Sequence, residues 1–170
     1  MQLSHHIDFD FVLNLPVQTA ISFVRDVENS LSKASFISDL KLNDDNLLEA
    51  GIPVNAALFG QQTLEFKSHL VTIDHGARLE PIDIATNAPG WAKVSGLSVV
   101  SPAKHGSRVE YSFDITIMLN LPKAEKWGGK ALTKMIEFTA SKVLERICSS
   151  FPNAVQEAAK ELEISFEQVS

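Results

Sequence analysis

One stretch, RVEYSFDITIMLNL at residues 108–121, limits the folds open to this chain more than any other. Apolar side chains stand at every second position, and the positions between them are polar apart from Met118. The apolar positions are Val109, Tyr111, Phe113, Ile115, Ile117, Leu119 and Leu121. Because side chains alternate between the two faces of a strand, this period of two predicts a long strand with one buried face, which is typical of an antiparallel sheet.

Six further stretches have the composition of strands. Residues 7–15 alternate in the same way, with Ile7, Phe9, Phe11, Leu13 and Leu15 on one face. The others are residues 36–46, 47–58, 63–74, 77–85 and 91–101, separated by turn residues such as His75-Gly76 and Pro89-Gly90. We therefore expect a sheet of about seven strands.

Two segments have the three- and four-residue spacing of amphipathic helices. The first follows Pro16, and we expect it to break near Asp26 or Glu28 into a second short helix. The second is the long C-terminal segment from about Glu125 to Leu162, in which we expect Pro152 to cause a kink or an interruption. Its apolar stripe contains Leu132, Met135, Ile136, Thr139, Ala140, Val143, Ile147, Ser150 and Phe151.

A sheet with one apolar face and a long helix with one apolar side can each bury that surface against the other. The sequence thus predicts an α+β fold, in which a curved antiparallel sheet wraps around the C-terminal helix. The length of 170 residues suits one domain, which we place at residues 1–170.

The composition excludes several classes of function and of site. The net charge of −6 and the sequence pI of about 5.3 argue against nucleic acid as a partner, because backbone phosphates need a basic face. Cys148 is the only cysteine, which excludes a disulfide framework and a thiolate metal site, and we expect it to pack as a small apolar residue. No signal peptide or run of 18 apolar residues is found, so we expect a cytoplasmic protein.

Three stretches together resemble the helix-grip fold of the START-like (SRPBCC) superfamily. They are FVLNLPVQTAISFVRD at residues 11–26, WAKVSGLSVVSPAKHGSRVEYSFDITIML at 91–119, and KALTKMIEFTASKVLERICSSFPNAVQEAA at 130–159. The layout looks most like the CoxG-like family associated with carbon monoxide dehydrogenase and like small bacterial families of unknown function. The resemblance implies a cavity between sheet and helix that holds a hydrophobic molecule. It leaves open two other activities known in the superfamily, cyclase or hydrolase chemistry and an adaptor role.

The candidate ligand-binding residues lie on the inward faces of the predicted elements. They are Phe9, Phe11, Phe66, Tyr111, Phe113, Ile115, Ile117, Met135, Ile136, Thr139, Val143 and Arg146. Thr139, Arg146 and Tyr111 would orient the polar end of a ligand. The alternative is a core in which these side chains fill the whole space, since periodicity identifies the inward faces and not the volume between them.

Three other patterns in the sequence do not predict a phosphate-binding, metal or catalytic site. In EKWGGKAL (residues 125–132) the spacing of a phosphate-binding loop is missing, so Gly128 and Gly129 are interpreted as a joint before the helix. The histidines lack the spacing of a zinc site, and we expect surface or turn positions for them. Four carboxylates, Asp8, Asp10, Glu110 and Asp114, would meet on a solvated outer face or form an acidic docking patch.

The sequence therefore predicts a binding protein for a small hydrophobic molecule, with no catalytic residues, metal or cofactor. An enzyme on the same fold would need a buried ionisable group, which the inward positions hardly offer. An interaction module is the other alternative. It would use Trp91, Trp127 and Phe138, the last of which could also mark a homodimer contact.

Overall fold

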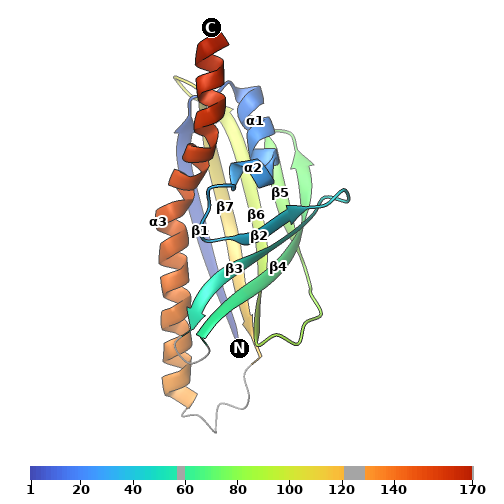
Figure 1. The fold of residues 1–170 in the computed structure, drawn as a ribbon, viewed down its shortest axis with the longest axis vertical. Coiled ribbons are helices and arrows are strands. Elements are labelled where there is room, and N and C mark those ends of the chain that lie inside the picture. The colour runs from blue at the N-terminus through green and yellow to red at the C-terminus, as the bar shows by residue number, and fades with distance from the viewer. Residues whose placement is uncertain (57–59, 121–128, 170) are drawn as a thin grey trace.

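The computed structural model describes residues 1–56, 60–120 and 129–169, with side chains described up to residue 166. Its elements follow the predicted order of a strand, two short helices, six strands and a long helix (Figure 1). They are β1 (Gln2–Leu13), α1 (Val17–Arg25), α2 (Val27–Ser30), β2 (Ser38–Leu42), β3 (Leu47–Ala56), β4 (Gly60–Ile73), β5 (Gly76–Ile82), β6 (Gly90–Pro102), β7 (Ser107–Leu119) and α3 (Gly129–Val169).

The strands form one seven-stranded sheet in the order β1-β7-β6-β5-β4-β3-β2. Neighbouring strands are antiparallel, and one parallel contact joins Glu65 of β4 to Trp91 of β6. The sheet curls, and α3 runs along it from the end at which β1 begins, past α1 at the other end (Figure 1). The predicted α+β fold, with a curved antiparallel sheet around the C-terminal helix, is confirmed.

β1 begins earlier than the alternation predicted, at Gln2 instead of Ile7. Ser4 pairs with Thr116 of β7, and their hydroxyl oxygens are 3.1 Å apart. His5 pairs with Ile115, which turns the imidazole toward the inner face of the sheet. The residues at the start of the chain are polar, so the alternation does not indicate that the strand extends to them. They form a strand because the partner strand pairs with them, and not through their own propensity alone.

The helix break predicted near Asp26 is confirmed. Asp26 ends α1 and caps α2, where its side chain accepts a hydrogen bond from the backbone N–H of Asn29 at 3.4 Å. Arg25 then anchors α1 to the sheet, because its guanidinium donates to the carbonyls of Ile73 and Gly76 at 2.5 and 2.9 Å.

α3 differs from the prediction in two ways. It is not interrupted at Pro152, and it continues to Val169. The flanking residues Phe151 and Val155 are fully packed in the core, which holds the helix in place despite the missing N–H at the proline. Cys148 was predicted to pack as an apolar residue and is instead exposed, since it lies on the outer side of α3. The predicted start at Glu125, together with Trp127 and Gly128, lies outside the described residues.

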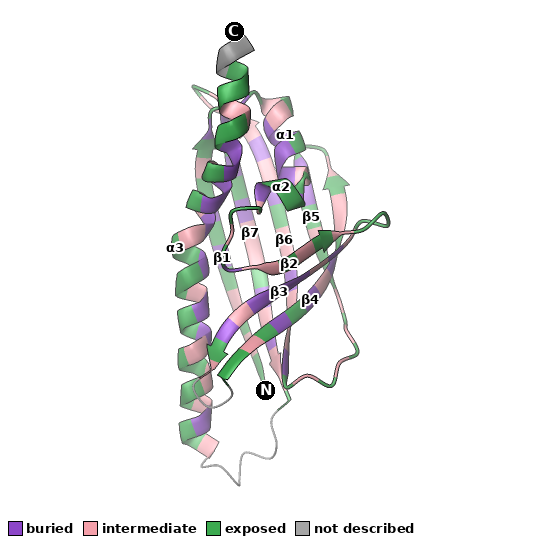
Figure 2. Ribbon diagram, in the orientation of Figure 1, coloured by how far each residue is buried: buried purple, intermediate pink, exposed green. Residues whose placement is uncertain are grey.

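Five aromatic rings fill the middle of the space between sheet and helix. Phe151 of α3 stacks on Phe9 with ring centroids 4.5 Å apart, and it meets Tyr111 and Phe113 edge-on at 4.9 and 5.3 Å. Phe36 approaches the same ring at 5.9 Å. Buried residues of the sheet and of the three helices surround this cluster (Figure 2). Any cavity must therefore lie toward one end.

Among the described residues, no helix is both long and apolar enough to cross a membrane.

Candidate ligand-binding pocket

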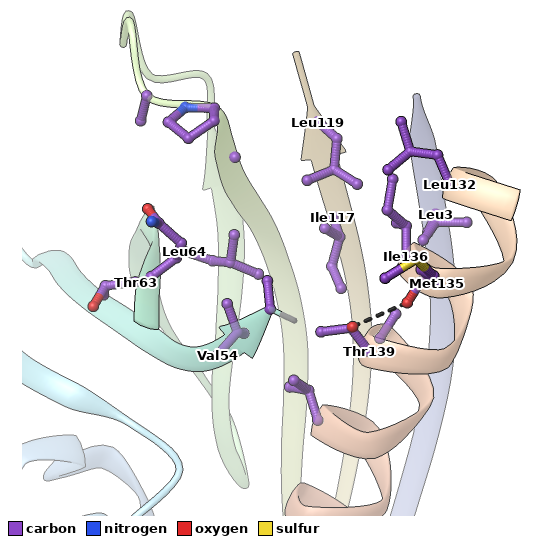
Figure 3. A pocket seen from close by; sticks show the side chains of 17 residues that line it. Leu3, Val54, Thr63, Leu64, Ile117, Leu119, Leu132, Met135, Ile136 and Thr139 are labelled. Carbon is purple, nitrogen blue, oxygen red and sulfur yellow. Dashed lines mark hydrogen bonds between the residues drawn. The ribbon is translucent and has the colours of Figure 1, made fainter. Parts of the chain in front are cut away.

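A pocket of about 100 Å³ lies at the end of the sheet where β1 and α3 begin (Figure 3). Three walls enclose it: the β3–β4 hairpin, the adjoining ends of β1, β6 and β7, and the first four turns of α3. The lining residues are Leu3, Val54, Ala56, Gln62, Thr63, Leu64, Ala88, Pro89, Gly90, Ile117, Leu119, Leu132, Met135, Ile136, Thr139, Ala140 and Val143. The pocket reaches solvent, since the Met135 side chain is 37% exposed.

The helix contributes to the pocket through a spacing of three and four residues. Leu132, Ile136, Ala140 and Val143 follow one side of α3 and line the pocket together with Ile117 and Leu119 of β7. Figure 3 shows Leu132 and Ile136 on the helix and Ile117 and Leu119 on the strand. Ala140 is buried and is smaller than the other residues of this stripe, so a larger side chain there would occupy part of the pocket.

Gly90 lets two larger side chains close the sheet side of the pocket. A Cβ atom at this position would lie 2.9 Å from a methyl of Leu64 and 3.0 Å from one of Leu119. Both distances are shorter than an ordinary carbon–carbon contact, so a larger residue would push these two leucines apart. The glycine thus allows β4 and β7 to line the pocket together.

The lining is almost wholly apolar. Among the described lining residues, only Gln62, Thr63 and Thr139 have polar side chains. The Thr139 hydroxyl donates to the Met135 carbonyl at 3.0 Å, as is common for a threonine within a helix (Figure 3). Thr63 is exposed at the surface of β4. No Asp, Glu, His, Lys, Arg, Cys or Tyr lines the pocket in the part of the chain that the structure describes.

The structure brings together five of the candidate ligand-binding residues. Ile117, Met135, Ile136, Thr139 and Val143 line the pocket. The other candidates, Phe9, Phe11, Phe66, Tyr111, Phe113, Ile115 and Arg146, are not among its lining residues. Most of these belong to the filled middle of the core or pack against it. Ligand contact by the five pocket residues remains a proposal.

Two of the predicted polar anchors lie elsewhere. Arg146 is exposed on α3, and its guanidinium donates to the carbonyl of Pro53 in β3. Tyr111 is not among the lining residues, and its ring, which is 7% exposed, packs among Phe11, Phe113 and Phe151. Within the described residues its hydroxyl is buried without a hydrogen-bond partner, and burial raises the pKa of the phenol.

We expect Tyr111→Phe to raise the free energy of unfolding by about 1 kcal/mol, since a buried hydroxyl without a partner costs about 1–3 kcal/mol. Urea denaturation followed by fluorescence would measure this. Tyr111→Leu is the matched control and should destabilise the protein, because it also removes the stacked ring. A lower stability for Tyr111→Phe would show that the hydroxyl has a hydrogen-bond partner.

The sequence analysis missed most of the β-strand side of the pocket. Val54 and Leu64 belong to predicted strands, but no pattern distinguished them from other inward residues. Leu3 was left out because the first strand was expected to begin at Ile7. Three small residues, Ala56, Ala88 and Gly90, also line the pocket. Small residues at inward positions, where the neighbouring inward residues are large, are the sequence signal that would have indicated this part of the pocket.

Of the five histidines, His5 alone departs from the expected surface or turn positions, and the other four are exposed. His5 lies on the inner face of β1, two residues after Leu3 of the pocket, and its Nε2 is buried without a partner in the described part of the chain. His6 lies on the outer face as predicted. Its Nδ1 is 2.7 Å from Asp114 and its Nε2 3.0 Å from Asp8, while the Ser112 hydroxyl is 3.4 Å from the same Nε2.

Ser112, His6 and Asp114 on the outer face have the composition of a Ser–His–Asp triad. Their hydrogen bonds, however, do not allow the catalysis of such a triad. A general base must leave its Nε2 free to take the serine proton, and here Asp8 occupies that nitrogen at closer range than Ser112. The four carboxylates predicted to meet on this face do so, with β1 and β7 paired. Arg108 binds Asp10 through two hydrogen bonds and lowers the pKa of that carboxyl. These hydrogen bonds and ion pairs therefore connect β1, the first strand, to β7, the last strand.

The pKa of His6 is raised because its imidazolium form is hydrogen-bonded to Asp114 and attracted by Asp8. The stabilisation is thus complete below the unfolded pKa of about 6.5 and is lost as the pH rises through the higher folded value. We expect His6→Gln to weaken the protein against urea at about pH 5.5 and to have a smaller effect at about pH 8.5. An equal effect at both values would contradict this assignment.

Comparison with solved structures places the chain in a known class. It is similar to the Zhui aromatase/cyclase from Streptomyces sp. R1128 with a TM-score of 0.51 and 11% identity, over 94% of this chain and 96% of that one. It is similar to the di-domain ARO/CYC StfQ from the steffimycin biosynthetic pathway with a TM-score of 0.54 and 14% identity, over 98% of this chain and 52% of that one.

A third match is the di-domain ARO/CYC BexL from the BE-7585A biosynthetic pathway, with a TM-score of 0.53, 15% identity and 92% of this chain covered. The chain spans 50% of BexL, about half of that di-domain protein. At these identities the likeness shows the fold alone. The fold is the helix-grip fold.

The chain belongs to the family described as "Protein of unknown function (DUF3809)", whose sequence profile matches residues 8–149. No curated protein sequence matches it. The particular similarity to the CoxG-like family stays a prediction.

Proposed function

We propose that this protein binds a small hydrophobic or amphipathic molecule in the pocket between the sheet and the start of α3, without chemical conversion. The apolar lining of a pocket that opens to solvent is the observation behind this proposal. Each Å² of apolar surface that a ligand buries contributes about 25 cal/mol before the losses of association. An apolar pocket that opens to water thus favours the binding of a hydrophobic group.

The size of the pocket limits the ligand. Sites for drug-sized molecules have volumes of roughly 300–1,000 Å³, and an apolar cavity of about 150 Å³ takes up benzene. A pocket of about 100 Å³ therefore suits one small ring or a short branched chain. A larger ligand would place one end inside and extend past Met135 into solvent.

A role as a cyclase, suggested by the names of the structural neighbours, receives less support. Acid–base catalysis needs a positioned group that transfers a proton. Within residues 1–56, 60–120 and 129–166, the pocket lining has no ionisable side chain. Binding without catalysis is the function that these residues favour.

Two measurements test the proposal. Protein purified from its native source would be extracted with organic solvent, and the extract examined by mass spectrometry for a lipophilic compound in molar proportion. Titration with 4-fluorotoluene, followed by ¹⁹F NMR line width, would measure binding of a single apolar ring. We expect saturable binding of the ring. The absence of both a co-purifying lipophile and saturable binding would refute the proposal.

A second candidate function is docking on a partner, and Phe138 is the observation in its favour. This side chain is 64% exposed on α3, one turn from Lys134 and from Lys142, whose ammonium lies 5.4 Å from the ring centroid. Trp91 is only half-buried, and Trp127 lies outside the described residues. Sedimentation of the protein and of Phe138→Ser would test for a homodimer. A monomer in both cases would remove the homodimer form of this candidate.

A further inference from the structure

We infer that the pocket selects uncharged ligands and excludes both anions and cations, so that any charged group of the ligand stays at the mouth. This inference rests on the proposed function and adds to it the chemical class of the ligand. It concerns the part of the molecule that enters between the β3–β4 hairpin and α3.

The absence of compensating charge inside the pocket is the first argument. None of the lining residues that the structure describes is ionisable, so an ion that entered would leave water without finding a counter-ion among them. An isolated charge moved into an apolar site loses several kcal/mol of hydration, far more than a single ring gains from burial. This penalty applies to anions and to cations.

Hydrogen bonding inside the pocket cannot replace that hydration. The wall facing the helix includes Val54, Leu64 and Ile117, and the helix side includes Ile136, Ala140 and Val143. Gln62 lies on the same face of β4 as Leu64, and its amide is uncharged. Thr139 is the one polar side chain among them on α3, and its hydroxyl proton is already donated to the Met135 carbonyl. It can therefore accept one hydrogen bond but cannot stabilise an anion.

The other polar side chains of the lining are on β4. Thr63 is exposed, whereas Gln62 is half-buried on the same face of β4 as the buried Leu64, and its uncharged amide supplies no counter-ion. A hydroxyl or carbonyl on the ligand would find water and the Thr63 hydroxyl at the mouth and the Gln62 amide on the inner face. The geometry thus orients an amphipathic ligand with its hydrocarbon end against Ala140.

His5 is the ionisable side chain that must be considered beside the pocket. It lies on the inner face of β1 two residues deeper than Leu3, its cross-strand partner is Ile115, and its Nε2 has no partner among the described residues. It is not part of the lining. A ligand acid could reach it only by passing the apolar inner wall, and the test includes a variant that detects this route.

Matched ¹⁹F NMR probes test the inference on the full chain. 4-Fluorotoluene and 4-fluorobenzoate have nearly the same shape and differ by a methyl against a carboxylate. 1-Ethyl-4-fluorobenzene and 4-fluorobenzylammonium form the corresponding pair for a cation. Titration in about 1 M NaCl reduces the screening length to roughly 3 Å and so removes the long-range repulsion that the net charge of −6 exerts on anions.

We expect each neutral probe to bind about ten-fold or more tightly than its charged counterpart, for both signs of charge. Equal binding of 4-fluorotoluene and 4-fluorobenzoate would overturn the inference and leave the proposed function intact. Equal binding of the cation and its neutral match would overturn it as well, because the pocket would then accept a charged group. Tight 4-fluorobenzoate binding that is lost in His5→Leu would identify an acid-binding site instead. If none of the four probes binds, this inference fails, and the proposed function fails with it only if no lipophile co-purifies with the protein.

Discussion

Replacing Phe151 with alanine lowers the free energy of unfolding by about 3–5 kcal/mol, the range for deleting a fully buried phenylalanine. Phe151 is 3% exposed and is the ring that Phe9, Phe36, Tyr111 and Phe113 all contact. Its removal leaves a cavity at the point where α3 crosses the sheet. The four remaining rings come from β1, β7 and the segment before β2, so they cannot close the gap without moving the sheet.

Urea denaturation followed by circular dichroism would measure this loss. Phe138→Ala is the matched control on the same helix, because it removes the same atoms from a side chain that is 64% exposed. We expect the control to change the free energy of unfolding by less than about 1 kcal/mol. A similar loss for both variants would show that the effect comes from helix propensity and not from the aromatic cluster.

The aromatic cluster and the pocket divide the space between sheet and helix. Large rings meet where Phe151 crosses β1 and β7. Toward the start of α3 the facing residues become aliphatic and small, with Ala140 on the helix and Gly90 on β6. The sequence left two alternatives open, a filled core and a cavity. Both are present in this fold: the space is filled around Phe151, and the pocket lies toward the start of α3.

The fold could be predicted almost completely from periodicity. The alternation in β7 and the proline-started helix after β1 are local patterns, and local patterns determine which face of an element is buried. The start of β1 at Gln2 could not be predicted in the same way. Ser4, His5 and His6 have no apolar alternation, and they become strand because β7 supplies partners for them.

The site could be predicted only in part, for a physical reason. Inward positions such as Phe66 and Ile117 have the same pattern, and only packing in three dimensions decides which of them borders free space. Phe66 is buried in the core, whereas Ile117 lines the pocket. The volume left over depends on small residues on separate strands, among them Ala56 and Gly90. Sequence spacing does not relate these residues to each other.

Ala140→Leu should weaken the binding of 4-fluorotoluene by about ten-fold or more, because it fills the space that the ring would occupy. Ala140 is buried on α3 and faces a pocket of about 100 Å³. The added side chain occupies a large part of that volume. Since it enters empty space, we expect the free energy of unfolding to change by less than about 1.5 kcal/mol. The dissociation constant from ¹⁹F NMR and the urea midpoint are the two readouts.

Ser141→Leu is the control for this variant, since it adds a leucine at the next position of α3 on the exposed side. It should leave probe binding unchanged. Val54→Leu enlarges the opposite wall from β3 and should weaken binding in the same direction, which protects the test if Ala140→Leu folds poorly. Undiminished binding in both pocket variants would mean that the ring binds elsewhere. A loss in both with no loss in Ser141→Leu would assign the ring to the space between Ala140 and Val54, because only there do the two substitutions act on the same volume.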